Sequence, residues 1–61
     1  MHISVSDYDL MAQDATYLIH NGTAFQPAVD TIAAENKLNQ DQRNMLSGFT
    51  TETLNALMSE D

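Results

Sequence analysis

Three aspartates near the N-terminus and two histidines are the side chains of this chain whose types could do chemistry. Asp7, Asp9 and Asp14 are the oxygen ligands that a calcium-binding loop would use, but their spacing does not fit one. Met11 and Ala12 stand at the fifth and sixth positions, where an oxygen ligand and a glycine are expected. We therefore expect no metal site.

The histidines lack the neighbours that catalysis requires. His2 lies beside Met1, and His20 falls in the last turn of a predicted helix, where a partly charged imidazole suits the helix dipole. A nucleophile with its base and orienting group must be held by a rigid shell of packed residues. A chain of 61 residues has little of that shell. We therefore expect no enzyme activity, no cofactor and no small-molecule substrate.

The composition predicts one small acidic domain. Of the 61 residues 43% are hydrophobic, and no cysteine is present that could form a disulfide or a thiolate metal site. Nine acidic and two basic residues give a net charge of -7, which opposes direct binding to nucleic acid or to an anionic membrane. No apolar stretch approaches the ~20 residues of a membrane span. The N-terminus lacks the pattern of a signal peptide, so we expect a cytoplasmic protein.

Caps and apolar periodicity predict an all-α fold, a small three-helix bundle. Its expected parts, within a single domain 1–61, are an extended tail over 1–5 and helices over 6–20, 27–36 and 39–58. Ser6 is expected to cap the first helix, and Asn21 with Gly22 to end it. Pro27 fits the first position of the second helix, because it has no amide hydrogen to offer. An earlier start capped by Thr23 is the alternative.

The third predicted helix has a clear start and a weak point. Asn39 and Gln42 match a capping box. Gly48 costs ~1 kcal/mol in a helix interior, so a break there, with Thr50 capping a fourth short helix, is the alternative to one long helix. We favour the long helix because the apolar period continues through the glycine.

Apolar residues at helical spacing predict the centre of the bundle. The expected members are Leu10, Leu18, Ile19, Val29, Ile32, Leu46, Phe49 and Leu57. Met11, Ala15 and Ala33 are expected beside them, with Phe25 packing just ahead of the second helix. Replacing Phe49 with Ala costs ~3–5 kcal/mol if its ring is fully buried.

Some apolar residues exceed what such a bundle needs. Ile3 and Val5 alternate with polar neighbours as in a strand, so they form either a loose tail or a strand that pairs with another chain. Apolar and methionine side chains on the third helix exceed what the short second helix can cover. The candidate protein interface comprises Ile3, Val5, Arg43, Met45, Leu54, Leu57 and Met58.

Both basic residues lie in ENKLNQDQRNML, around the predicted turn between the second and third helices. Lys37 falls near a helix C-terminus, where a cation is favoured. Arg43 is expected to pair with Glu35 or Asp30 across the turn, and its alternative role is that of a polar anchor for a partner.

The acidic residues divide into two groups. First turns of helices, where the dipole favours a carboxylate, hold Asp7, Asp9, Asp30 and Asp41. The remaining, scattered carboxylates are Asp14, Glu35, Glu52, Glu60 and Asp61. Mimicry of DNA requires rows of carboxylates spaced like phosphates. An acidic inhibitor that mimics DNA and binds a nucleic-acid-handling enzyme is therefore the alternative, and a solvated acidic surface is favoured.

Residues 28–57 combine an alanine-rich helix, a Leu-Asn-x-x-Gln turn, an arginine and a Thr-Glu-Thr before a final apolar pair. This pattern resembles a helix-turn-helix stretch of small phage-encoded proteins, virion components among them. The matching positions are Leu38, Asn39, Gln42, Arg43, Thr51, Glu52 and Thr53. The resemblance covers half of the chain and implies an accessory or virion structural protein of a phage, located in the host cytoplasm or the virion. The sequence thus predicts a small acidic protein for protein–protein interaction or assembly, as a homo-oligomer or in a larger complex.

Overall fold

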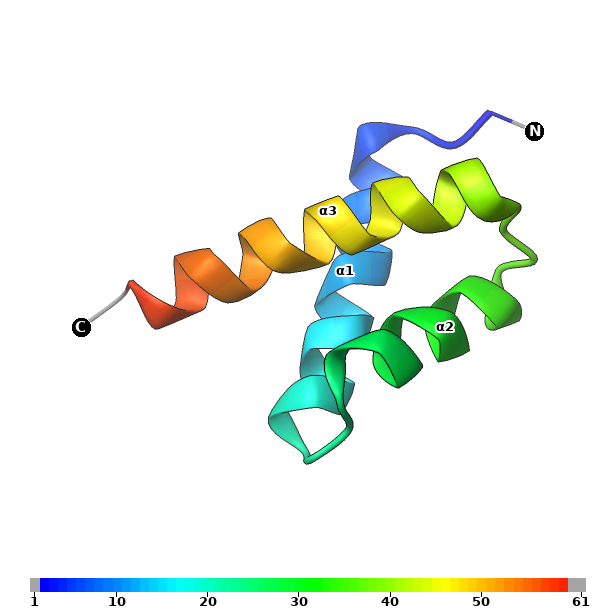
Figure 1. The fold of residues 1–61 in the computed structure, drawn as a ribbon. Helices are drawn as coiled ribbons and strands as arrows, with labels where there is room; N and C mark the ends of the chain where they lie inside the picture. The colour runs from blue at the N-terminus through cyan, green and yellow to red at the C-terminus, as the bar shows by residue number, and fades with distance from the viewer. Residues whose placement is uncertain (1, 60–61) are drawn as a thin grey trace.

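The chain folds into three helices joined by two short turns: α1 (Val5–His20), α2 (Phe25–Glu35) and α3 (Gln40–Met58) (Figure 1). The computed structural model describes residues 2–59, and within this range it contains no strand. Each helix packs against the other two, so the predicted all-α three-helix bundle is confirmed. Three residues lie outside the described range: Met1 of the predicted tail, and the scattered carboxylates Glu60 and Asp61.

The start of α1 differs from the prediction. Ser4, and not Ser6, is the N-cap, because the Ser4 hydroxyl accepts a hydrogen bond of 3.2 Å from the backbone N–H of Asp7. The prediction of an extended tail through residue 5 is therefore wrong at Val5, which is the first residue of the helix. Ile3 is half-buried and packs against the core of its own chain. Ile3 and Val5 therefore do not form a strand in this structure.

The turn between α1 and α2 follows the predicted C-terminal signal. Asn21 is the C-cap and Gly22 has a positive φ of 107°. The N–H of Gly22 donates to the carbonyl of Ile19 at 3.1 Å, and the N–H of Thr23 donates to that of Leu18 at 2.9 Å. These two bonds define a Schellman motif, in which a residue of positive φ satisfies the last carbonyls of the helix.

The turn between α2 and α3 repeats this motif without a glycine. Lys37 has a φ of 56°, and its N–H donates to the carbonyl of Ala34 at 3.2 Å. The N–H of Leu38 donates to the carbonyl of Ala33 at 2.9 Å. The left-handed conformation costs about 1–2 kcal/mol in a residue with a Cβ atom. Burial of Leu38 against the core offsets part of that cost.

The second helix begins between the two predicted starts. Phe25 is its first residue, and Ala24 is the N-cap, with no side-chain hydrogen bond. Pro27 therefore occupies the third helical position and not the first, and the alternative of a Thr23 cap is also wrong. Proline is tolerated there because the amides of a first turn have no partner within the helix. The first backbone hydrogen bond of the helix runs from the N–H of Ala28 to the carbonyl of Ala24, at 3.0 Å.

The predicted capping box at the start of α3 is confirmed. The N–H of Gln42 donates to Oδ1 of Asn39 at 2.8 Å, and the N–H of Asn39 donates back to Oε1 of Gln42 at 2.9 Å. The helix then continues without a break through Gly48 to Met58. The alternative of a fourth short helix is therefore wrong.

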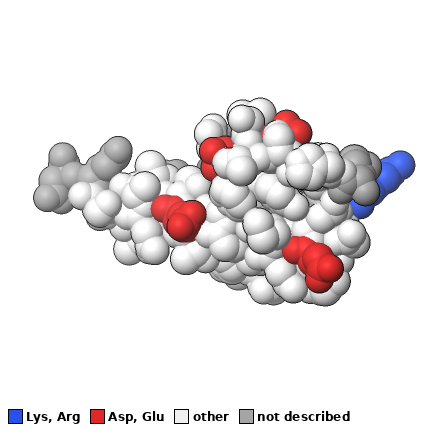
Figure 2. All heavy atoms as spheres, turned by 90° about the horizontal axis from the view of Figure 1, so that it is seen from above, with Lys and Arg blue, Asp and Glu red and all other residues white. Residues whose placement is uncertain are grey.

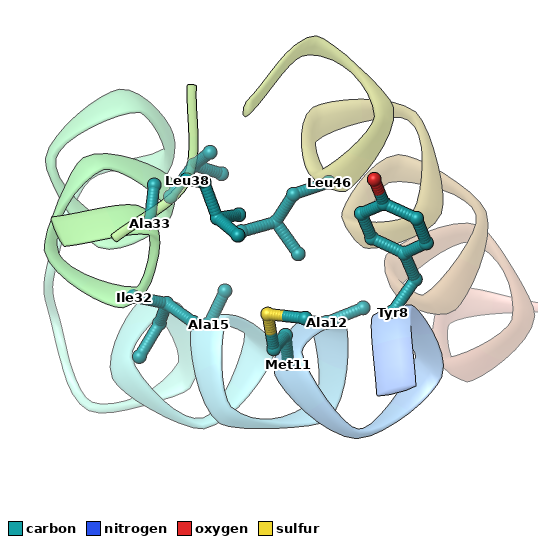
Figure 3. Packing of buried hydrophobic residues seen from close by; sticks show 9 residues of the cluster. Tyr8, Met11, Ala12, Ala15, Ile32, Ala33, Leu38 and Leu46 are labelled. Carbon is teal, nitrogen blue, oxygen red and sulfur yellow. The ribbon is translucent and has the colours of Figure 1, made fainter. Parts of the chain in front are cut away.

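The core combines large side chains with several alanines (Figure 3). Val29, Ile32 and Leu46 are buried as predicted. Fully buried alanines lie between the helices and allow their backbones to approach closely: Ala12, Ala15, Ala28 and Ala33. At one end of the core the rings of Tyr8 and Phe49 stack, with centroids 5.2 Å apart and planes 9° from parallel.

Several of the predicted core residues lie elsewhere. Leu10 is 59% exposed and Leu57 is 53% exposed, so their assignment to the centre is wrong. Leu18 and Phe49 are half-buried and pack against the edge of the core, and Ile19 is half-buried. The buried face of α1 includes Met11 and Ala15, as predicted. Its other buried side chains were not predicted, and these are Tyr8, Ala12 and Thr16. Leu10 is directed away from this face, whereas the exposure of Leu57 has a different cause.

The third helix extends past the rest of the molecule. In Figure 1 its C-terminal turns, coloured orange to red, continue to the left with no other helix beside them. The molecule measures 38 × 21 × 14 Å. With 19 residues α3 is about 28 Å long, whereas the 11 residues of α2 span about 16 Å. The end of α3 therefore lies beyond the reach of α2.

Candidate interaction surface

The inward face of α3 is buried in the first part of the helix and exposed near its C-terminus. Leu46 and Thr50 are fully buried, and Leu54 is half-buried, whereas Leu57 is 53% exposed. These residues follow one another at intervals of three or four positions, so they share one face of the helix. Leu57 therefore points in the same direction as the buried Leu46. It is exposed because the body of the bundle ends before it.

Residues from the last turns of α1 and α3 form a continuous surface at this place. Two hollows lie between the helices, and Thr16, His20 and Leu57 line both of them. We define the end surface by the residues that line either hollow: Gln13, Thr16, Tyr17, Ile19, His20, Thr53, Leu54, Leu57 and Met58. Tyr17 is 69% exposed and Met58 is 81% exposed. The surface thus combines an aromatic ring with aliphatic and thioether side chains.

The described side chains of the end surface include no carboxylate, lysine or arginine. His20 lies in the last turn of α1, as predicted, and the other polar members are neutral. This neutrality stands out in a chain of net charge -7. On the face that Figure 2 shows, the acidic side chains form separate patches and no continuous row.

Thr16 lies beneath the end surface with an unsatisfied hydroxyl group. Its side chain is buried, and its Oγ1 atom has no hydrogen-bond partner within the described chain. Other helical threonines each donate to the carbonyl four residues earlier, at 2.8–3.0 Å, and these are Thr31, Thr50, Thr51 and Thr53. A buried hydroxyl without a partner costs about 1–3 kcal/mol. The end surface therefore contains a hydroxyl group without a hydrogen-bond partner as well as apolar side chains without cover.

The structure brings together only part of the predicted interface. Leu54, Leu57 and Met58 belong to the end surface. Met45 is exposed but lines a separate shallow hollow on α3, together with Phe49 and other residues. Ile3 and Val5 lie at the start of α1, far along that helix from its last turn. The interface role of each of these residues stays a prediction.

Arg43 has a structural contact of the kind predicted. Its guanidinium lies 3.6 Å from Oδ1 of Asp30, which also accepts a hydrogen bond of 3.1 Å from Nε2 of Gln26. Asp30 was one of two expected partners, and the pair links α2 to α3. A pair this exposed contributes at most about 1 kcal/mol. Its alternative role as an anchor for a partner stays a prediction.

The aspartates considered as metal ligands do not form a binding site. Asp7, Asp9 and Asp14 all lie within α1, so they form no loop. In residues 2–59 no group of three or more His, Asp or Glu side chains is placed to hold a metal ion. None of the described helices has the length and apolar character that crossing a membrane requires.

Comparisons of the chain with protein-family models, with curated protein sequences and with solved structures find no match. The resemblance of residues 28–57 to phage proteins therefore stays a prediction. The end surface is the candidate site, because an apolar face of the described chain is left uncovered there.

Proposed function

We propose that this chain is a small helical protein for protein–protein interaction or assembly, and that it binds its partner through the end surface. One observation carries the proposal. The core-facing stripe of α3 continues past the bundle, so that Leu57 is 53% exposed while Leu46 on the same face is fully buried. A partner that covers this extension completes a core that the chain begins but does not close.

The chemistry of the end surface supports a protein as the partner. Covering one exposed leucine or methionine side chain contributes about 1.5–3 kcal/mol. Tyrosine and methionine are both enriched in protein interfaces, and Tyr17, Leu57 and Met58 are exposed next to one another around the two hollows. The acidic balance opposes nucleic acid and anionic lipid. The alternative of a DNA mimic has less support, because the carboxylates seen in Figure 2 form no row.

The proposal is tested in an extract of cells that produce the chain at low level. The native mass of the chain is measured by size-exclusion chromatography with immunodetection. We expect the unmodified chain to elute well above its monomer mass of 6.8 kDa. Leu57→Glu should shift it to the monomer position, because a carboxylate then faces the partner in a desolvated contact.

The matched control is Leu10→Glu. Leu10 has almost the same exposure as Leu57, 59% against 53%, but lies outside the end surface. The control should keep the larger mass, and circular dichroism should show both variants folded. A monomer mass for the unmodified chain both in extract and in concentrated purified solution, or an equal loss with both variants, contradicts the proposal.

A further inference from the structure

We infer that the partner at the end surface is a second copy of this chain, which binds through its own end surface about a two-fold axis. This inference rests on the proposed function and names the partner. A two-fold contact places the same patch of both copies face to face, so that patch must be complementary to itself in both shape and charge. The end surface meets the two conditions.

The end surface has a projecting part next to a recess, as a self-complementary shape requires. Leu57 and Met58 lie on the projecting end of α3, where Figure 1 shows no helix beside them. The hollows next to them are completed by α1, through Thr16, Tyr17 and His20. In a two-fold dimer the end of α3 of each copy enters the hollow beside α1 of the other. Both copies then make the same contact twice.

Its charge also favours a second copy. Any carboxylate near the centre of a two-fold contact faces its own equivalent, and such like-charge contacts are destabilising. The described side chains of the end surface carry none, although the chain has a net charge of -7. A basic partner, in contrast, is recognised by a surface lined with carboxylates. A neutral apolar patch on an acidic chain is where two such chains can meet.

The last turns of two helices form a small contact, at the lower end of specific interfaces, below ~1,200 Å² in total. We therefore expect a reversible dimer with a dissociation constant of roughly micromolar order. Two acidic chains repel one another over distances that salt screens. Higher salt should therefore tighten the dimer, whereas it would weaken a complex of this chain with a basic protein.

The first test uses the purified full chain in sedimentation velocity, over a series of protein and salt concentrations. We expect a monomer–dimer equilibrium that shifts toward the dimer as salt increases. Leu57→Glu should raise the dissociation constant more than about tenfold, since the change removes a buried contact at two symmetric positions. Leu10→Glu should leave the constant within about twofold of the unmodified value.

The second test uses the absence of cysteine in the natural chain. Chains carrying Tyr17→Cys are mixed with chains carrying Leu57→Cys under mild oxidation. The dimer places these positions next to each other across the interface, so the mixed disulfide should form in excess over either self-linked species. A mixture of Leu10→Cys with Leu57→Cys chains should show no such excess. A random distribution in both mixtures overturns the two-fold arrangement.

The two proposals fail in distinguishable ways. A purified chain that stays monomeric at all salt and protein concentrations overturns the second-copy inference. If that same chain still elutes in a large complex from extract, and Leu57→Glu abolishes the complex, the proposed function stands with a foreign partner. Monomer in both experiments overturns both proposals.

Discussion

The two halves of α3 have similar residues and opposite surroundings. Residues 40–50 belong to the part of α3 that packs on the bundle, where Leu46 and Thr50 are fully buried. Residues 51–58 continue the same apolar stripe, but Leu57 and Met58 are exposed there. No helix lies directly beside the last turns of the second half (Figure 1). A leucine on the inward face of one helix thus stabilises the fold at one end and is available to a partner at the other.

Leu46→Ala, in the first half of α3, should cause the largest loss in the free energy of unfolding. Removing a fully buried leucine side chain costs about 3–5 kcal/mol, because the cavity closes only in part. A domain of this length has a total free energy of unfolding of only about 3–9 kcal/mol. The variant should therefore be largely or partly unfolded at 25 °C, as measured by urea titration with far-ultraviolet circular dichroism. A loss below about 1 kcal/mol would place Leu46 outside the core.

A smaller loss is expected from Phe49→Ala, near the boundary of the two halves. The full cost of about 3–5 kcal/mol applies to a buried ring, but Phe49 is half-buried, so we expect about 2–3 kcal/mol. Part of this comes from its stacking on Tyr8. A double-mutant cycle with Tyr8→Leu should give a coupling of about 0.5–1.5 kcal/mol. Additive effects of the two changes would contradict the stacked geometry.

Gly48 lies in the first half of α3, two residues before the fully buried Thr50, and its replacement by Ala should be stabilising. A Cβ atom at this position meets no atom within 4 Å. Alanine exceeds glycine in helix propensity by about 0.5–1 kcal/mol. Gly48→Ala should therefore raise the midpoint of urea unfolding by a corresponding amount. A destabilised variant would indicate that α3 bends or breaks at the glycine, so that the two halves are separate helices.

Local signals made much of the fold predictable from the sequence. The capping box of Asn39 and Gln42 and the glycine that ends α1 depend on neighbours a few residues apart, and both predictions are confirmed. The same local signals are ambiguous between Ser4 and Ser6, since both hydroxyls can cap a helix. In the structure Ser4 is the cap, and Tyr8 lies in the core one turn later.

The choice of core face on α1 was less predictable. The predicted stripe included Leu10, which is exposed, whereas Tyr8 and Ala12 are buried and were not predicted. Small residues are favoured between helices because they permit close approach of the backbones. This preference depends on which helices meet and at what depth, and a single sequence does not contain that geometry.

The candidate site shows the same limit. Leu54, Leu57 and Met58 were predictable as excess apolar residues, but their neighbours on α1 were not. Tyr17 and His20 lie next to them only because α1 packs across α3. On the sequence alone, His20 is explained by the helix dipole and Tyr17 has no assigned role. An aromatic residue and a histidine one turn apart at a helix end were the only local signal.

Leu57→Ala should have the smallest effect on the free energy of unfolding. It also tests most directly whether the two halves of α3 differ in their surroundings. Leu57 follows Leu46 on the same face of α3, about three turns later, so the two variants differ in surroundings and not in chemistry. In dilute solution, where the chain is monomeric, Leu57→Ala should change the free energy of unfolding by less than about 0.5 kcal/mol. At high protein concentration it should weaken self-association measurably, because a partner then covers this side chain. A loss of more than about 2 kcal/mol in the dilute monomer would mean that Leu57 is part of the core, and the distinction between the two halves of α3 would disappear.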